Sequence, residues 1–201
     1  MFSYLDYNLI IKKMKKITIL LITLMFTIPT FSQGFSIDTG LGMSFAGGDI
    51  FDDTDVKTGV DLKLIQLNYK FNESFGATVS IASSAHTYTD SGSGGTAGLG
   101  RFSIGPSYTL PLGGVSWEIK PQIVVSSSGV IEDNDFGDSD IDKASGFVIG
   151  NSLLFGTNEG FQFIANVDLV TGKVKEAEGV KIDSDNSYSY FNIGVGVRYN
   201  F

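Results

Sequence analysis

The sequence predicts an all-β protein, an eight-stranded antiparallel up-and-down β-barrel that follows an N-terminal export segment. Three observations carry this prediction. From Phe35 to Phe201, apolar and polar residues alternate with a period of two, which is typical of strands with one apolar and one polar face. No window after Phe35 shows the sustained 3.6-residue period of an amphipathic helix. The connections between the alternating segments are short and long in turn, as in a meander.

Composition excludes several classes of site. The 201-residue chain has no cysteine, so it holds no disulfide framework, thiolate metal site or cysteine nucleophile. Its single histidine, His86, rules out any scheme that needs two imidazoles. The net charge of −8 argues against a nucleic-acid partner, because phosphate binding requires an excess of Lys and Arg. We therefore expect no cofactor and no nucleic acid.

The first 32 residues are interpreted as a secretory signal peptide. Four lysines within residues 12–16 precede an apolar run at 17–28, and Thr30 and Ser32 supply the small residues of a cleavage site. As a helix, this run rises only about 18 Å, too little for a hydrocarbon core of about 30 Å. Cleavage after residue 32 leaves a barrel domain at 33–201 with a net charge of −11. Since Met14 is a natural initiator, residues 1–13 are a candidate over-extended start.

Eight segments carry the alternation, at residues 35–45, 60–71, 75–86, 101–110, 115–125, 147–155, 161–169 and 191–201. Within the second segment the apolar residues change parity, which predicts a β-bulge near Leu64. Tight turns are expected at 72–74, 111–114 and 156–160, and long polar loops at 46–58, 88–98, 129–143 and 172–187. With eight strands, both ends of the barrel fall at the short-turn end.

Alternation by itself leaves open which face points inward. A soluble, lipocalin-like barrel would enclose the apolar face around a ligand, whereas a membrane barrel would turn it toward lipid. The polar face consists of small residues with a few opposite charges, which suits a narrow lumen. The segments have about the 9–11 residues that cross a bilayer when tilted. Aromatic residues form two bands, as expected at the level of lipid headgroups. These observations favour a transmembrane barrel.

This orientation assigns places to named residues. The lumen side receives a charge network: Asp38, Arg101, Glu118, Lys120, Asp168 and Arg198. The membrane girdle at the short-turn end consists of Tyr69, Phe71, Phe75, Tyr108, Trp117, Phe155, Phe161 and Tyr199. A second band beside the long loops consists of Phe45, Tyr88, Phe147, Tyr188 and Tyr190. We interpret the charges as a structural plug of ion pairs, with a selectivity or proton path as the alternative.

The ending, residues 194–201 (GVGVRYNF), alternates up to a terminal phenylalanine. With the strand pattern and the loop alternation, this ending resembles small eight-stranded outer-membrane β-barrels of the OmpA/OmpX kind, also grouped as outer-membrane β-barrel or porin-family proteins. The resemblance implies an integral protein of the Gram-negative outer membrane, with Tyr199 and Phe201 as a signal for the outer-membrane assembly machinery. Pro106 and Pro121 depart from the pattern, because proline removes a ladder donor, and predict a disturbed local register.

Acidic residues gather in the expected loops. The loop at 129–143 offers a candidate cation-binding set, Asp133, Asp135, Asp138 and Asp140, since hard cations prefer carboxylate oxygens. The glycine of this loop comes one place early for an EF-hand and no glutamate closes it, so a solvated loop tip is the simpler interpretation. His86 follows Ser83 and Ser84, but a lone histidine is weak evidence for nucleophilic catalysis.

We therefore expect a non-enzymatic, monomeric outer-membrane protein that displays four acidic surface loops, with a role in surface structure or adhesion. Its expected partners are outer-membrane lipid, the assembly machinery and an extracellular ligand at the loops. Three alternatives stay open: a narrow porin-like channel or transporter for small solutes, a lipid-modifying outer-membrane enzyme, and a soluble ligand-binding barrel.

Overall fold

The computed structural model describes residues 34–51, 58–90, 93–133, 137–181 and 187–201. The expected signal peptide at 1–32 lies outside the described residues. Within these ranges, no helix is long and apolar enough to cross a membrane. The strands are β1 (Phe35–Gly47), β2 (Gly59–Lys70), β3 (Phe75–Asp90), β4 (Ser93–Pro111), β5 (Val115–Asp133), β6 (Gly137–Phe155), β7 (Gly160–Ala177), β8 (Val180–Lys181) and β9 (Ser187–Asn200), with a 3₁₀ turn, η2 (Asp49–Phe51).

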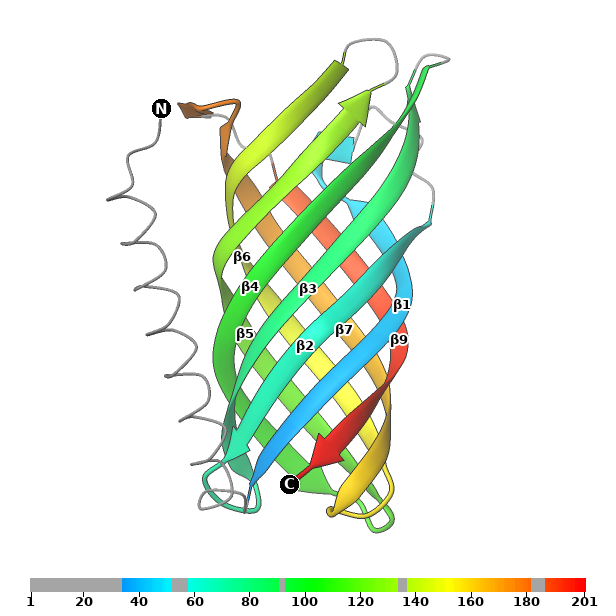
Figure 1. The fold of residues 1–201 in the computed structure, drawn as a ribbon, viewed down its shortest axis with the longest axis vertical. Helices are drawn as coiled ribbons and strands as arrows, with labels where there is room; N and C mark the ends of the chain where they lie inside the picture. Colours follow the sequence, from blue (N-terminus) through cyan, green and yellow to red (C-terminus); the bar gives the residue numbers. More distant parts are fainter. Residues whose placement is uncertain (1–33, 52–57, 91–92, 134–136, 182–186) are drawn as a thin grey trace, which may run out of the picture. The chain divides into compact units, whose positions relative to one another are not determined.

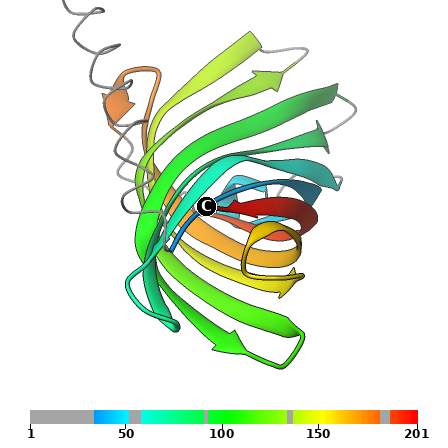
Figure 2. The same cartoon turned by 60° about the horizontal axis from the view of Figure 1, so that its bottom comes forward.

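Eight of these strands close into a ring. Each of β1 to β6 pairs with the next strand in sequence, and β9 pairs with both β7 and β1. The two-residue β8 is a short hairpin return on β7 and takes no part in closure. Every pairing is antiparallel, and the strands run obliquely around the barrel (Figures 1 and 2). The predicted all-β class and the eight-stranded antiparallel barrel are confirmed.

The tight turns lie where the sequence predicts them. In the β2–β3 turn, Asn72 Oδ1 accepts hydrogen bonds from the backbone N–H groups of Ser74 and Phe75 at 3.0 and 2.8 Å. Gly113, in the β4–β5 turn, has a φ of +79°, a conformation that glycine adopts without strain. Ser36 of β1 pairs with Asn200 of β9, while the neighbouring Phe35 pairs with Tyr69 beside the first turn. Both ends of the barrel therefore lie at the short-turn end, as expected.

The β-bulge predicted near Leu64 is confirmed. The register of β2 against β3 shifts between Lys63 and Ile65, and its register against β1 shifts at the same level. Leu64 and Ile65 are consecutive, and both are exposed on the outer face. This extra residue turns Asp61 and Lys63 inward, although their parity differs from that of Gln66 and Asn68.

Pro106 and Pro121 interrupt the pairing of β4 with β5, but the predicted disturbance of the register is wrong, because the register is the same on both sides and the shift in this strand pair lies between Phe102 and Ser103. Pairing of β4 with β5 is interrupted between the pairs Ile104–Ile123 and Tyr108–Ile119, a stretch that contains both prolines. Each proline lacks the N–H group that would donate to the ladder. Because both prolines lie in the same unpaired stretch, fewer ladder hydrogen bonds are lost than if they interrupted the pairing at two places.

Three of the four expected loops are largely strand. Residues 88–98, 129–143 and 172–187 were predicted to be long polar loops, and this is wrong for most of their described residues. In the last of them, β7 runs to Ala177 and β8 spans Val180–Lys181. β3 runs to Asp90 and β4 starts at Ser93, while β5 runs to Asp133 and β6 starts at Gly137. Beyond the pair Val60–Ala85, β3 has no partner on β2, so the β3–β6 sheet extends past the β1–β2 edge (Figure 1). The glycines, serines and aspartates of these stretches lie within a pleated sheet.

The amphipathic pattern inverts along the barrel. Toward the short-turn end, apolar side chains point outward and polar ones inward. In the extension, the outward positions are mostly small or polar, as at Thr87, Thr96 and Glu132, and an apolar cluster lies in the interior. This cluster consists of Phe51, Tyr88, Ala97, Leu99, Val124, Ile141, Ala144, Val148, Val170, Val174, Tyr188 and Tyr190. The extension thus has the inside of a water-soluble barrel.

This inversion corrects the second aromatic band. Phe45 and Phe147 are exposed on the outer face, as expected. Tyr88, Tyr188 and Tyr190 were placed in the same band, but they are buried in the interior cluster. Tyr88 has the parity of the inward His86, and Tyr188 and Tyr190 have that of the inward Asn192, so the same alternation continues to this height and places all three tyrosines inside.

Candidate functional site: the closed lumen

The lumen holds a balanced set of charges. Among the described residues, eight charged side chains are buried: the carboxylates Asp38, Asp61, Glu118 and Asp168, and the cations Lys63, Arg101, Lys120 and Arg198. All six residues predicted for the lumen network belong to this set. Asp61 and Lys63 were not named in the sequence analysis. The bulge predicted near Leu64 changes the parity of the strand, and this change turns both side chains inward. Four negative and four positive charges leave the interior neutral, which lowers the cost of burial.

Arg198 lies at the centre of the cluster nearest the short turns. Its Nε donates to Asp38 Oδ1 at 2.6 Å and its Nη2 to Asp38 Oδ2 at 2.8 Å. The same guanidinium donates to Glu118 Oε1 at 3.2 Å and to Oε2 at 2.6 Å. Asp38 is on β1 and Glu118 on β5, so one arginine joins opposite walls of the barrel. Forked bonds to two carboxylates are the strongest arrangement that a guanidinium makes.

Other side chains add hydrogen bonds to the two carboxylates of this cluster, although the buried Gln66 Oε1 has no hydrogen-bond partner among the described residues. Lys120 Nζ donates to Glu118 Oε2 at 3.1 Å and to Ser152 Oγ at 2.7 Å. Thr109 Oγ1 donates to Glu118 Oε1 at 3.2 Å, and Gln66 Nε2 donates to Asp38 Oδ2 at 2.8 Å. Glu118 and Lys120 are fully buried. Each charged side chain of the cluster is thus bonded to an opposite charge within the protein.

Two further ion pairs cross the lumen nearer the outer end. Lys63 Nζ of β2 lies 3.0 Å from Asp168 Oδ2 of β7. Arg101 of β4 donates through Nη2 to Asp61 Oδ1 at 2.9 Å and through Nη1 to Ser84 Oγ at 2.8 Å. Asn192 of β9 also donates to Asp61 Oδ1, at 2.9 Å. Together with the Arg198 cluster, these pairs connect strands on all sides of the barrel.

His86 ends a directed chain of hydrogen bonds. Asn192 Nδ2 donates to Asp61, so Asn192 Oδ1 is the acceptor for the hydroxyl of Ser44. The proton of Ser44 is therefore committed to Asn192, and His86 Nε2, 2.9 Å from Ser44 Oγ, acts as the donor. A histidine that donates to a serine cannot remove its proton. Nucleophilic catalysis requires the opposite direction, in which the serine hydroxyl donates its proton to the histidine.

An aromatic layer covers His86 on the outer side. The Tyr190 ring stacks on the imidazole at 4.9 Å and 13°, and the Phe51 ring lies 6.1 Å away. Phe51 belongs to η2 and is buried against the same cluster. His86 is itself buried, as the lumen-facing structural interpretation requires. The lumen is thus filled by ion pairs toward one end and by apolar side chains toward the other.

The other predicted site residues occupy the outer wall or the hairpin ends. All eight girdle residues (Tyr69, Phe71, Phe75, Tyr108, Trp117, Phe155, Phe161 and Tyr199) are exposed. Tyr199 of the expected assembly signal is the penultimate residue of β9, and Phe201 follows that strand.

The candidate cation-binding set lies at the β5–β6 hairpin. Asp133 and Asp138 are strand residues next to the hairpin end, and Asp140 pairs with Val130. Asp135 falls outside the described residues, and the side chains of Asp133 and Asp138 are not described. In the described part of the chain, no group of three or more carboxylate or imidazole side chains converges as a metal site would require.

Replacing Arg198 with methionine should destabilise the barrel strongly, because Asp38 and Glu118 keep their charges without the cation between them. Removing one partner of a buried pair costs about 3–5 kcal/mol of unfolding free energy. Urea unfolding of the protein refolded into phospholipid vesicles measures this loss. Val197→Met, at an outward position on the same strand, is the control and should cost far less. The double variant Arg198→Met/Glu118→Gln restores charge balance and should recover part of the loss. An Arg198→Met variant as stable as the control would contradict the plug.

No family model and no curated protein sequence matches the chain. Solved structures do match. Neisserial surface protein A superimposes with a TM-score of 0.59 at 12% identity, over 84% of this chain and 97% of that one. Ail, the attachment invasion locus protein of Yersinia pestis, superimposes with a TM-score of 0.50 at 19% identity, over 82% of this chain and 98% of that one. The chain has the fold of the small outer-membrane β-barrels, which confirms the resemblance at the level of fold.

Proposed function

We propose that this chain is a non-enzymatic integral outer-membrane protein with a sealed lumen, which presents its β3–β6 extension at the cell surface for a structural or adhesive role. The observation that carries the proposal is the charge-balanced interior beneath an apolar cap, in which each of the eight buried charged side chains lies in an ion pair. A barrel of this kind offers its walls to lipid and its extension to the outside, and it offers no path through the middle.

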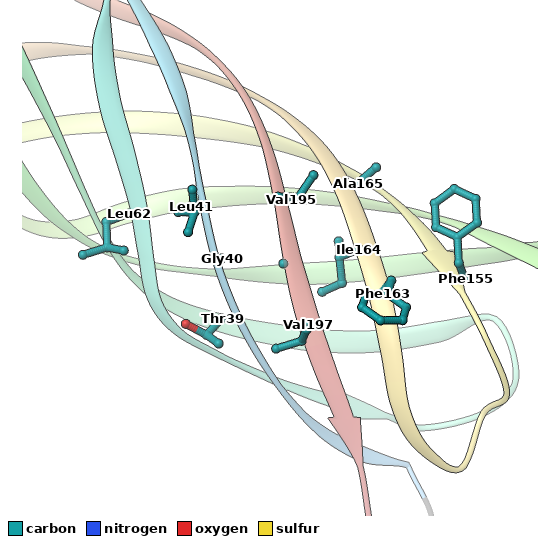
Figure 3. A pocket seen from close by; sticks show the side chains of 11 residues that line it. Thr39, Gly40, Leu41, Leu62, Phe155, Phe163, Ile164, Ala165, Val195 and Val197 are labelled. Atoms are coloured by element: carbon teal, nitrogen blue, oxygen red, sulfur yellow. The ribbon is translucent and has the colours of Figure 1, made fainter.

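The outer wall supports the membrane placement. Apolar side chains cover it over the lower barrel, and Leu41, Phe163 and Val195 are 67%, 72% and 62% exposed. Figure 3 shows part of this wall, a shallow groove of about 560 Å³ between side chains of β1, β2, β6, β7 and β9. Contiguous apolar area on this scale is unfavourable in water and favourable against acyl chains. Ring closure is the second requirement for crossing hydrocarbon, since it leaves no unpaired strand edge.

The extension supports a role in presentation. Its inner face packs on an apolar cluster that it shares with η2, β7 and β9, so the sheet holds a defined surface. Small and polar side chains on its outer face leave the backbone accessible, and surfaces of this kind carry recognition in many scaffolds. Neisserial surface protein A and the attachment invasion locus protein share the fold, and their names describe surface and attachment roles. The C-terminal strand remains the expected contact of the assembly machinery.

Nitroxide labels test the membrane placement. In electron paramagnetic resonance, labels at Val79, Ile119 and Val195 should collide often with dissolved oxygen and rarely with a water-soluble nickel complex, because these side chains contact acyl tails. Labels at the consecutive bulge residues Leu64 and Ile65 should both behave in this way. Ser128 and Thr96, on the extension, are controls that should show the opposite preference. Nickel-accessible labels at Val79, Ile119 and Val195 would invert the barrel and remove the proposal.

Planar-bilayer recording tests the sealed lumen. The refolded chain should show no steady open level, because every buried cation in the described part of the chain is paired across or along the wall. The variant Lys120→Ala/Glu118→Ala removes a charge pair while keeping neutrality, and it should raise the frequency of brief openings by widening the interior. A stable open level in the wild type would favour the narrow-channel alternative.

The lipid profile of cells tests the absence of catalysis. Since Ser44 donates to Asn192 and His86 donates to Ser44, His86→Gln should leave the acylation and headgroup pattern of the outer membrane unchanged. A strain that lacks the protein is the comparison. A profile altered equally by deletion and by His86→Gln would restore the lipid-modifying enzyme as the function.

A further inference from the structure

A short segment after β1 closes the interior of the barrel at its outer mouth. η2 brings Phe51 into the apolar cluster, where its ring lies 6.1 Å from the imidazole of His86 and 6.3 Å from the ring of Tyr190. The backbone N–H of Phe51 donates to the carbonyl of Gly48 at 2.8 Å and so closes the turn. We call η2 (Asp49–Phe51) the cork.

A group of exposed hydrogen bonds ties the cork to β9. Ser187 Oγ donates to Asp49 Oδ2 at 2.7 Å, and the backbone N–H of each residue donates to the side chain of the other at 3.3 Å. Because water competes for exposed hydrogen bonds, these contribute little, and the closed position depends largely on the burial of Phe51. A short element held in this way opens at low cost.

His86, beneath the cork, has a buried nitrogen without a partner. Its side chain is 1% exposed. Because Nε2 donates to Ser44, the neutral ring carries its proton there and leaves a lone pair on Nδ1. Among the described residues, Nδ1 has no hydrogen-bond partner. A second proton on this ring would therefore create a buried N–H without an acceptor together with a buried positive charge, and both are costly.

The groups around His86 do not compensate for such a charge. In the described ranges, the charged or titratable side chains of the elements packed around it are Asp49 on η2, Asp61 on β2, Tyr88 on β3, Arg101 on β4, and Tyr188 and Tyr190 on β9, while β5, β6 and β7 contribute apolar residues. Asp61 is already paired, since Arg101 donates to it at 2.9 Å. Burial raises the pKa of Tyr188 and the pKa of Tyr190, so both phenols are neutral.

The position of His86 couples its protonation to the cork. It lies past Ile81, the last large apolar residue exposed on β3, and so beyond the lipid-facing wall. Burial lowers the pKa of His86 below its usual 6.5, although Asp61 and Ser44 act in the opposite direction. In an open state, water solvates the ring and the pKa returns to about 6.5. Acid therefore favours the open state: below about pH 6.5, the ratio of open to closed molecules rises by up to about tenfold per pH unit, until the pKa of the closed state is reached.

We propose that η2 is an acid-released cork: protonation of His86 frees Phe51 from the aromatic layer and opens the outer mouth of the barrel. The release exposes the apolar interior of the extension to the outside. The cluster of Arg198 with Asp38 and Glu118 lies nearer the short turns and does not contact His86, so the lumen stays sealed while its cap opens. This inference goes beyond the sealed lumen proposed above, and its failure would leave that proposal intact.

Thiol accessibility tests the cork, because the chain has no cysteine of its own. Ala97→Cys places one thiol in the apolar cluster, at the position that pairs with His86. Thr96→Cys, on the outward face of the same strand, is the matched control. Each refolded variant reacts with dithiodipyridine, a small water-soluble disulfide, and the ratio of the two rates cancels the pH dependence of the reagent. Between about pH 7.5 and about pH 5, the ratio of the Ala97→Cys rate to the Thr96→Cys rate should rise about tenfold.

Two further variants, made with the Ala97→Cys reporter, assign the response to named residues. His86→Gln keeps a donor for Ser44 but takes up no proton, so the thiol should stay protected at both pH values. Phe51→Ala removes the ring of the cork and should leave the thiol reactive at both.

Three results would each overturn the inference: a ratio that does not change with pH, an acid response that persists in His86→Gln and so arises from carboxylates or from general unfolding, or a thiol that stays protected in Phe51→Ala. Val174→Cys, in the same cluster on β7, provides the measurement if Ala97→Cys does not refold.

Discussion

The structure depends on one constraint: a backbone amide or carbonyl that faces hydrocarbon must have a hydrogen-bond partner within the protein. A sheet meets this requirement only by closing on itself, and β9 closes the ring by pairing with β1 along twelve residue pairs. Closure with eight strands leaves a lumen that side chains fill. Glycines at the β1–β9 seam permit the close approach, since a Cβ on Gly42 would collide with the carbonyl of Ile193.

A lumen of this width dictates its own chemistry. Polar side chains that point inward cannot be solvated freely, so charges must be balanced and bonded to one another. Arg198 between Asp38 and Glu118, and Lys63 opposite Asp168, meet that requirement across the barrel rather than along one strand. The resulting network joins the walls of the barrel, and the proposed sealed lumen rests on these same contacts.

Position along the strands decides which environment each face meets. Below the outer rim, the outside is apolar and the inside is polar; in the extension, both assignments are reversed. The extension therefore resembles a soluble barrel continued from the lower barrel. One continuous fold thus has two zones, one with an apolar outer wall and one with an apolar interior.

The sequence by itself determined the strand periodicity, the closed eight-stranded class, the tight turns, the bulge at Leu64 and the inward position of six charged residues, because each of these follows from alternation over a few neighbouring residues. Only the tertiary structure decided that residues 88–98, 129–143 and 172–177 are mostly strand, and which of the lumen charges meet across the barrel. Those features depend on which environment surrounds a given height of the barrel and on which strands meet across it. Local alternation cannot encode either of them, since a period of two is the same whether the apolar face meets lipid or an interior core.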